Sequence, residues 1–271
     1  MSYSAILMTK NQPMTSKFVK HEPCPHCGSK DNLGVWDDGH KWCFGCGYFV
    51  PGSAIETFRS FKVKEKEKPA SIPFPSGTTN ILGPFGKLWL DRYQITPIEI
   101  FKYRILWSNH GVTLQNNSII SPLLIFPIYD DSNFCIFWQG RNFSSVQKNP
   151  KYYSRGNKEA VNAVLGGSDK DTVFLVEDML SAIKVARFAK SFPLFGSDIS
   201  PARAKKLSEK TRHIVLWLDP DKYQSSSGKS SPVLILKRQL TSLFENVDVL
   251  YTSRDPKDYA NDEIKRFINQ Y

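Results

Sequence analysis

Three apolar stretches of strand length in the C-terminal half of the chain lead into acidic residues. The runs VFLVED, HIVLWLDPD and VDVLYTSRDP bring Glu177, the pair Asp219 and Asp221, and Asp255 to the ends of predicted strands. Parallel strands end at one edge of an open α/β sheet, where such sheets bind ligands, so these side chains should converge. Crowded carboxylates need counter-charge, which Mg²⁺ supplies. Any one of them could instead cap a helix, but the repeated pattern favours one site.

Helix signals follow these strands. The run DMLSAIKVARFAK after Glu177 has the apolar spacing of an amphipathic crossover helix. Ser200 and Pro201 predict the start of a second helix, with Arg203 on its solvent-exposed face. Alternating strands and helices predict an α/β domain with a parallel sheet.

Four of the five cysteines form two Cys-x-x-Cys pairs that are separated by fifteen residues. Two such pairs can present four thiolates to one zinc ion, so this spacing predicts a small β zinc ribbon rather than disulfides. One structural zinc ion per chain would supply most of the folding energy of so small a module. The expected ligands are Cys24, Cys27, Cys43 and Cys46.

The segment between the cysteine pairs mixes aromatic with polar side chains. Asp38, His40 and Trp42 are candidates for stacking on unpaired bases and reading their edges. The alternative is a ribbon that serves only as a structural staple.

Composition changes after the ribbon. Residues 61–79 combine alternating charge with three prolines, which is typical of a semi-extended tether. We therefore expect a zinc ribbon over 1–60, a flexible linker over 61–79 and a larger domain over 80–271. The larger domain divides into a basic subdomain, 80–168, and the acid-bearing subdomain, 169–271.

The charge balance indicates a polyanionic partner. Thirty-six Lys and Arg against 26 Asp and Glu give a formal charge of +10 over 271 residues. The sequence has no apolar run of about eighteen residues and no signal-peptide core, so we expect a cytoplasmic protein without a membrane partner.

An LVE strand end, a following helix and a later Asp-x-Asp pair resemble the Toprim fold of primases, topoisomerases and nucleases. Asp178 stands where that family more usually has Gly. The run FWQGRNFSSVQKNPKYYSRG resembles the primase signature in which Gly-Arg ends a strand and Pro-Lys-Tyr follows. This resemblance implies that Arg141, Lys151 and Arg155 line a groove for the template and the incoming triphosphate. The alternative is a solvated basic surface.

The run DGHKWC resembles the zinc-binding domain of the primase-helicases of T-odd bacteriophages. In that family an Asp and a His at matching positions read the template, which implies this role for Asp38 and His40. The resemblance to phage-type and bacterial primases covers about residues 22–262. The expected architecture is thus an α/β Toprim-containing catalytic domain with a small N-terminal β zinc ribbon.

The resemblance implies a stand-alone DNA primase that joins ribonucleoside triphosphates into short RNA primers on single-stranded DNA. Glu177, Asp219, Asp221 and Asp255 would hold catalytic magnesium or manganese, and Glu177 could instead act as a general acid or base. No Walker motif is present, so a separate replicative helicase is the expected partner, in the host cytoplasm if the protein is phage-encoded.

Two other functions remain open. A Toprim nuclease would use the same acids with water as the nucleophile. A non-catalytic zinc-ribbon protein would bind single-stranded DNA as a replication accessory factor.

Overall fold

The computed structural model describes residues 16–50, 71–115, 117–144, 149–168, 170–224 and 230–271. The chain divides into two compact units, Met1–Val63 and Lys64–Tyr271. Each unit is described by itself. None of the helices in these described ranges is long and apolar enough to cross a membrane.

The N-terminal unit is a four-stranded antiparallel sheet with a core made largely of cysteine. Its small core consists of Cys24, Leu33 and Cys43, with Cys46 and Tyr48 packed against them. So few apolar side chains cannot stabilise an independent module without a further constraint. The strands, in spatial order, are β1 (Phe18–Glu22), β2 (Leu33–Trp36), β3 (Lys41–Cys43) and β4 (Phe49–Val50).

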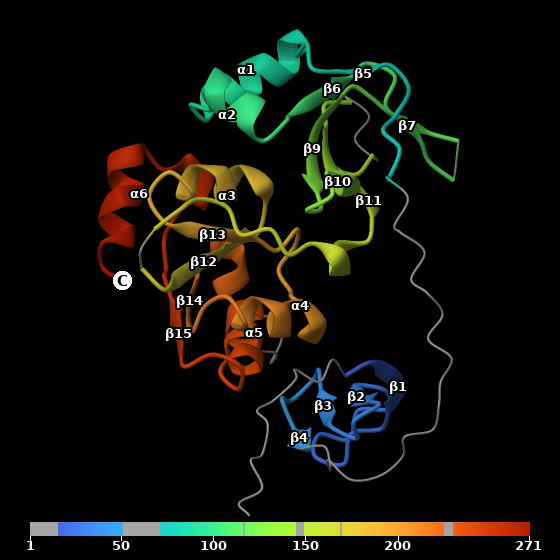
Figure 1. Cartoon of the computed structure of the whole chain (residues 1–271), viewed down its shortest axis with the longest axis vertical. Helices are drawn as coiled ribbons and strands as arrows, with labels where there is room; N and C mark the ends of the chain where they lie inside the picture. The colour runs from blue at the N-terminus through green and yellow to red at the C-terminus, as the bar shows by residue number, and fades with distance from the viewer. Residues whose placement is uncertain (1–15, 51–70, 116, 145–148, 169, 225–229) are drawn as a thin grey trace, which may run out of the picture. The chain divides into compact units, whose positions relative to one another are not determined.

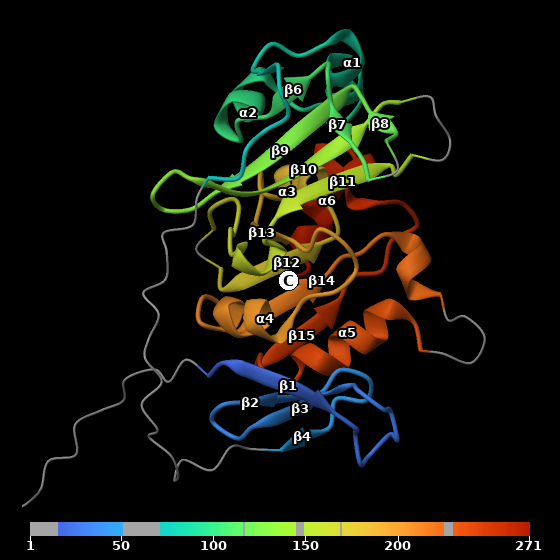
Figure 2. The same cartoon turned by 90° about the vertical axis from the view of Figure 1, so that its right-hand side faces the viewer.

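The predicted parallel α/β sheet is confirmed in the C-terminal unit. Four parallel strands lie in the order β13 (Lys190–Pro193), β12 (Thr172–Val176), β14 (His213–Leu216) and β15 (Asn246–Val249). Both faces of this sheet are buried, which explains why its strands read as continuous apolar runs. One face is covered by α3 (Met179–Val185) and α6 (Asn261–Ile268), the other by α4 (Pro201–Ser208) and α5 (Pro232–Leu240), as Figures 1 and 2 show.

A second, antiparallel sheet precedes the parallel one in the chain. Phe137 on this sheet shares a hydrophobic core with Met179 and Ile183 of α3, which joins the two sheets. Its strands, in spatial order, are β11 (Tyr152–Gly156), β10 (Cys135–Asn142), β9 (Leu123–Tyr129), β6 (Leu106–Ser108) and β5 (Thr78–Thr79). The remaining elements of this region are α1 (Pro84–Arg92), α2 (Pro97–Lys102), the hairpin of β7 (Val112–Thr113) and β8 (Ile119–Ile120), and the 3₁₀ turn η1 (Lys158–Ala160).

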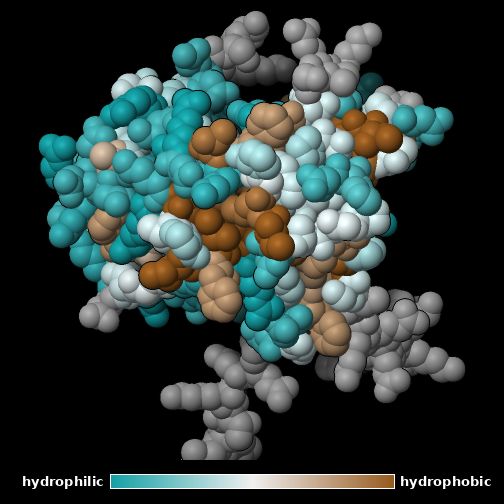
Figure 3. Space-filling model, turned by 90° about the horizontal axis from the view of Figure 1, so that it is seen from above, coloured by the Kyte–Doolittle hydropathy of each residue, from teal (hydrophilic) through white to brown (hydrophobic). Residues whose placement is uncertain are grey.

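Helices α1 and α2 present apolar side chains to solvent. The exposed side chains include Phe85, Leu88, Ile98 and Phe101, and Ile81 just before α1 is also exposed. Figure 3 shows apolar surface gathered on the face of the molecule that carries these helices.

Part of the predicted linker is packed against the antiparallel sheet. Residues 61–70 lie outside the described ranges, but residues 71–79 contact the sheet directly. The Ile72 amide donates to the Cys135 carbonyl at 2.7 Å, and the Trp138 indole donates to the Pro73 carbonyl at 3.2 Å. Both bonds join this stretch to residues of β10.

The prediction that Arg203 lies on the solvent-exposed face of its helix is wrong. Ser200 caps α4 as predicted, but the Arg203 side chain is fully buried. Its guanidinium donates to the carbonyls of Val161, Leu194 and Pro193 at 2.9 to 3.1 Å. The planar guanidinium group can donate to several carbonyls at once. The spacing of residues in the sequence does not indicate where these carbonyls lie.

Candidate functional site

Three of the four predicted metal-binding acids meet at the carboxyl edge of the parallel sheet. Glu177 directly follows β12, and Asp219 begins the 3₁₀ turn η2 (Pro220–Tyr223) after β14. Ligand atoms of Glu177, Asp219 and Asp221 lie within 4.8 Å of one another. The Asp219 amide donates to Glu177 Oε1 at 3.0 Å, which fixes the two strand ends to each other.

The electrostatics of this acid cluster call for a cation. Burial raises the pKa of Glu177 to about 7 and the pKa of Asp219 to about 8. Asp219 Oδ1 is buried and has no hydrogen-bond partner among the described residues. A carboxylate oxygen in that position is suited to bind a hard divalent cation, so the cluster fits the magnesium or manganese ion that its sequence pattern predicts.

Asp255 lies outside the group of three. It begins the 3₁₀ turn η3 (Pro256–Asp258), and its Oδ2 accepts from Lys257 Nζ at 2.6 Å. The same ammonium lies 2.9 Å from Asp178 Oδ2 and 3.7 Å from Asp219 Oδ2. Lys257 was not among the predicted site residues, because nothing in its local sequence indicates that Asp178, the buried N-cap residue of α3, will contact it.

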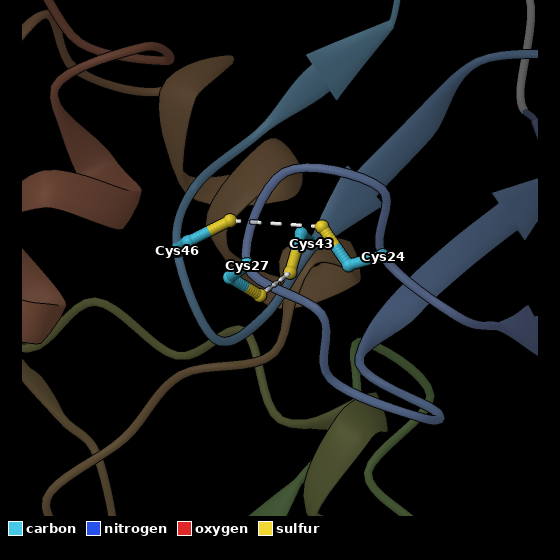
Figure 4. A group of neighbouring side chains, drawn as sticks. All are labelled: Cys24, Cys27, Cys43 and Cys46. Carbon is cyan, nitrogen blue, oxygen red and sulfur yellow. Dashed lines mark hydrogen bonds between the residues drawn. The ribbon is translucent and has the colours of Figure 1, made fainter.

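The four predicted zinc ligands converge in the ribbon (Figure 4). Sγ atoms are 3.7 Å apart in the pair Cys24 and Cys46, and 3.6 Å apart in the pair Cys27 and Cys43. Four sulfurs at about 2.3 Å from a tetrahedral zinc ion lie about 3.8 Å from one another, so the group fits that ion.

Two of the predicted base-reading residues, Asp38 and His40, lie on the turn between β2 and β3, and the third, Trp42, lies in β3. His40 Nδ1 lies 2.5 Å from Asp38 Oδ1, and the His40 ring stacks on Trp36 at 4.4 Å. Trp42 is only 7 % exposed and packs against Phe49, so it is a core residue of the ribbon. Phe49, half exposed and 6.2 Å from the His40 ring, was missed because it follows the motif rather than lying in it.

The predicted basic residues are divided between the two faces of the antiparallel sheet. Arg141 is paired with Tyr152, whereas Arg155 is paired with Trp138. Side chains alternate along a strand, so Arg141 and Arg155 point to opposite faces. Lys151 is exposed and directly precedes β11.

Arg141 shares its face with Phe137, which packs toward α3. Its guanidinium lies over the rings of Tyr152 at 5.2 Å and Trp89 at 5.6 Å. Two of its nitrogens, Nε and Nη1, are buried without a hydrogen-bond partner among the described residues. Burial, followed by the charge of Asp178, raises the pKa of Tyr152.

Comparisons with solved structures identify the fold. A DNA primase domain from Pseudomonas aeruginosa aligns with a TM-score of 0.52 and 15 % identity, over 69 % of this chain and 71 % of that one. The zinc-binding and RNA polymerase domains of the Aquifex aeolicus primase align with a TM-score of 0.50 and 15 % identity, over 95 % of this chain and 80 % of that one. The chain has a primase fold.

Sequence comparison finds a short but closer match. A DNA helicase/primase of Enterobacteria phage T3 is 50 % identical over 38 residues, which is 14 % of this chain and 7 % of the phage protein. No family model matches the chain. The primase fold thus comes from structural likeness over most of the chain, and the phage likeness from one short segment.

Proposed function

We propose that this chain is a DNA primase that synthesises short RNA primers on single-stranded DNA. The observation that carries the proposal is the cluster of Glu177, Asp219 and Asp221 at the carboxyl edge of the parallel sheet, where Asp219 Oδ1 is buried and unpartnered. The primase fold supports assigning this cluster to nucleotidyl transfer rather than to another use of a Toprim-like sheet.

The reaction joins the 3′ hydroxyl of one nucleotide to the α-phosphate of the next, and pyrophosphate leaves. Glu177, Asp219 and Asp221 would hold a divalent ion, which when bound aligns the reactants and neutralises charge that develops on the phosphate. Asp255 supports the site through Lys257, which contacts both Asp255 and Asp219. The unpartnered nitrogens of Arg141 would bind a template or triphosphate phosphate, because guanidinium donors fit phosphate oxygens.

The ribbon would select the template site. Asp38 would orient His40 through the 2.5 Å contact between Asp38 Oδ1 and His40 Nδ1. The half-exposed ring of Phe49 would stack on an unpaired base. Lys151 and Arg155, both exposed, would contribute sequence-independent contacts to the DNA backbone. A zinc ion on the four cysteines would hold this surface in shape.

Primer synthesis is tested with purified protein, single-stranded DNA of varied sequence, Mg²⁺ and labelled ribonucleotides. We expect short RNA products that are lost in Glu177→Ala and retained in Asp131→Asn, which changes an exposed acid in the β9–β10 turn. DNA cleavage without ribonucleotides would favour a nuclease instead. DNA binding without either product would favour the non-catalytic alternative.

A further inference from the structure

Part of the negative charge of the acid cluster is already balanced by lysine side chains. Two lysines already contact it: Lys222 pairs with Asp221 and lies 3.9 Å from Glu177, and Lys257 contacts three further acids. Five carboxylates and two ammonium groups therefore leave three net negative charges when all are ionised. One divalent ion would reduce this to one negative charge, whereas two would reverse its sign. The contacting acids are Glu177, Asp178, Asp219, Asp221 and Asp255.

Lys257 is held in place and is not a mobile surface side chain. Its side chain is 6 % exposed, and its ammonium contacts Asp178 and Asp255 at 2.9 and 2.6 Å. Its backbone carbonyl accepts from Lys184 Nζ at 2.8 Å, and the Tyr259 carbonyl accepts from the same nitrogen at 2.6 Å. Lys184 is itself buried on α3, so the turn that carries Lys257 is fastened to the helix after Glu177.

Of the carboxylates that contact Lys257, Asp178 has no oxygen left for an ion, whereas Asp219 has one. Both Asp178 oxygens are occupied, since Oδ1 accepts from the Ser181 amide at 2.8 Å and Oδ2 from Lys257. Asp219 lies between the two halves of the site. Its Oδ2 is 3.7 Å from the Lys257 ammonium, while its Oδ1 has no partner among the described residues and is available to an ion.

We propose that the Lys257 ammonium is a resident cation that takes the place of a second divalent ion, so that the cluster binds one divalent ion through Glu177, Asp219 and Asp221. In a two-metal site the ions lie about 3.5 to 4 Å apart and share a carboxylate. Here Asp219 would be shared between one ion and Lys257. A metal ion at the second position would have to displace the ammonium from Asp178 and Asp255. The use of this single divalent ion in catalysis rests on the proposed primase function, but the predicted number of bound ions does not.

The test is a count of bound Mn²⁺ on the full, zinc-loaded chain, measured by electron paramagnetic resonance without nucleotides, because triphosphates bring ions of their own. We expect one Mn²⁺ per wild-type chain and none in Glu177→Ala at the same concentration. Lys257→Met should gain a second ion, with a spin-coupled spectrum, whereas Lys257→Arg should keep one. A structural role for Lys257 alone would not change the ion count.

Removal of one partner from a buried ion pair can prevent folding. The double variant Asp178→Asn with Lys257→Met removes one charge of each sign, so the site keeps its three net negative charges and should bind one ion. A second ion only in Lys257→Met would show that the charge of Lys257 sets the count. Two Mn²⁺ per wild-type chain, or one in a natively folded Lys257→Met, would overturn the proposal. If the wild type synthesises RNA and binds two Mn²⁺ ions, only the role of Lys257 is refuted. If it binds one Mn²⁺ ion and synthesises no RNA, only the primase function is refuted.

Discussion

The two predicted metal sites differ in how the fold depends on them. In the ribbon, Cys24 and Cys43 are themselves the buried core, together with Leu33. In the catalytic unit, Glu177 and Asp219 lie at the edge of a sheet that apolar side chains cover on both faces. We therefore expect the ribbon to need a metal ion in order to fold, and the catalytic unit to fold without one.

Loss of zinc should have the largest effect, and only in the ribbon. Cys43→Ser removes a fully buried ligand, and structural zinc contributes on the order of 10 kcal/mol to such modules. We expect loss of zinc by elemental analysis and loss of ordered ribbon resonances by NMR, with Mn²⁺ binding at the catalytic cluster retained. Cys135→Ser, at a buried cysteine outside the group, is the control for zinc content. Unchanged zinc in Cys43→Ser would contradict the assignment.

The catalytic unit should instead be sensitive to its packing. Arg203→Ala leaves three buried carbonyls without their donor, which should cost about 3 kcal/mol or more of unfolding free energy. A lower urea midpoint for the catalytic unit measures this. Lys206→Ala, on the exposed side of the same helix, should stay within about 0.5 kcal/mol of the wild type. Equal urea midpoints for the two variants would contradict the burial of Arg203.

The stability of the metal-free catalytic unit should depend on pH. The pKa values of Glu177 and Asp219 are raised in the folded state, so the folded state binds more protons than the unfolded state between their ordinary values and about 8. The contribution of these two acids to stability is then largest below the ordinary carboxyl pKa and is lost as the pH rises to about 8. Thermal unfolding from pH 5 to 8 should show this fall, and Mg²⁺ should reduce it most at pH 8. A flat profile in Glu177→Gln/Asp219→Asn would attribute the slope to these two acids, and an unchanged slope would exclude them.

Lys151→Ala should have the smallest effect. Removal of one exposed phosphate contact should weaken single-stranded DNA binding a few-fold and lower the slope of log affinity against log salt by about 0.7. Fluorescence anisotropy at several salt concentrations measures both quantities. Lys206→Ala is again the control, and identical slopes would place Lys151 on an inert basic surface.

Local patterns were sufficient where one segment determines its own structure. The apolar runs that end at Glu177 and Asp219 predicted the parallel sheet and the meeting of its acids, and Cys-x-x-Cys spacing predicted the cysteine cluster. The predicted cap at Ser200 is likewise confirmed by its bond to the Arg203 amide.

Local patterns were not sufficient where distant segments meet. Lys257 and Asp178 are 79 residues apart in the chain, so nothing near either residue indicated their ion pair. Burial of Arg203 depends on three carbonyls from two other segments. The opposite directions of Arg141 and Arg155 follow from strand register, which composition does not reveal.

The most direct test of the account is labelled ribonucleotide incorporation on single-stranded DNA, run side by side for wild type, Glu177→Ala and Cys43→Ser. The account predicts short RNA products from the wild type and none from Glu177→Ala. Cys43→Ser should extend a supplied primer while losing initiation at preferred template sites. RNA synthesis by Glu177→Ala at the wild-type rate would contradict the assignment of the acid cluster as the catalytic centre.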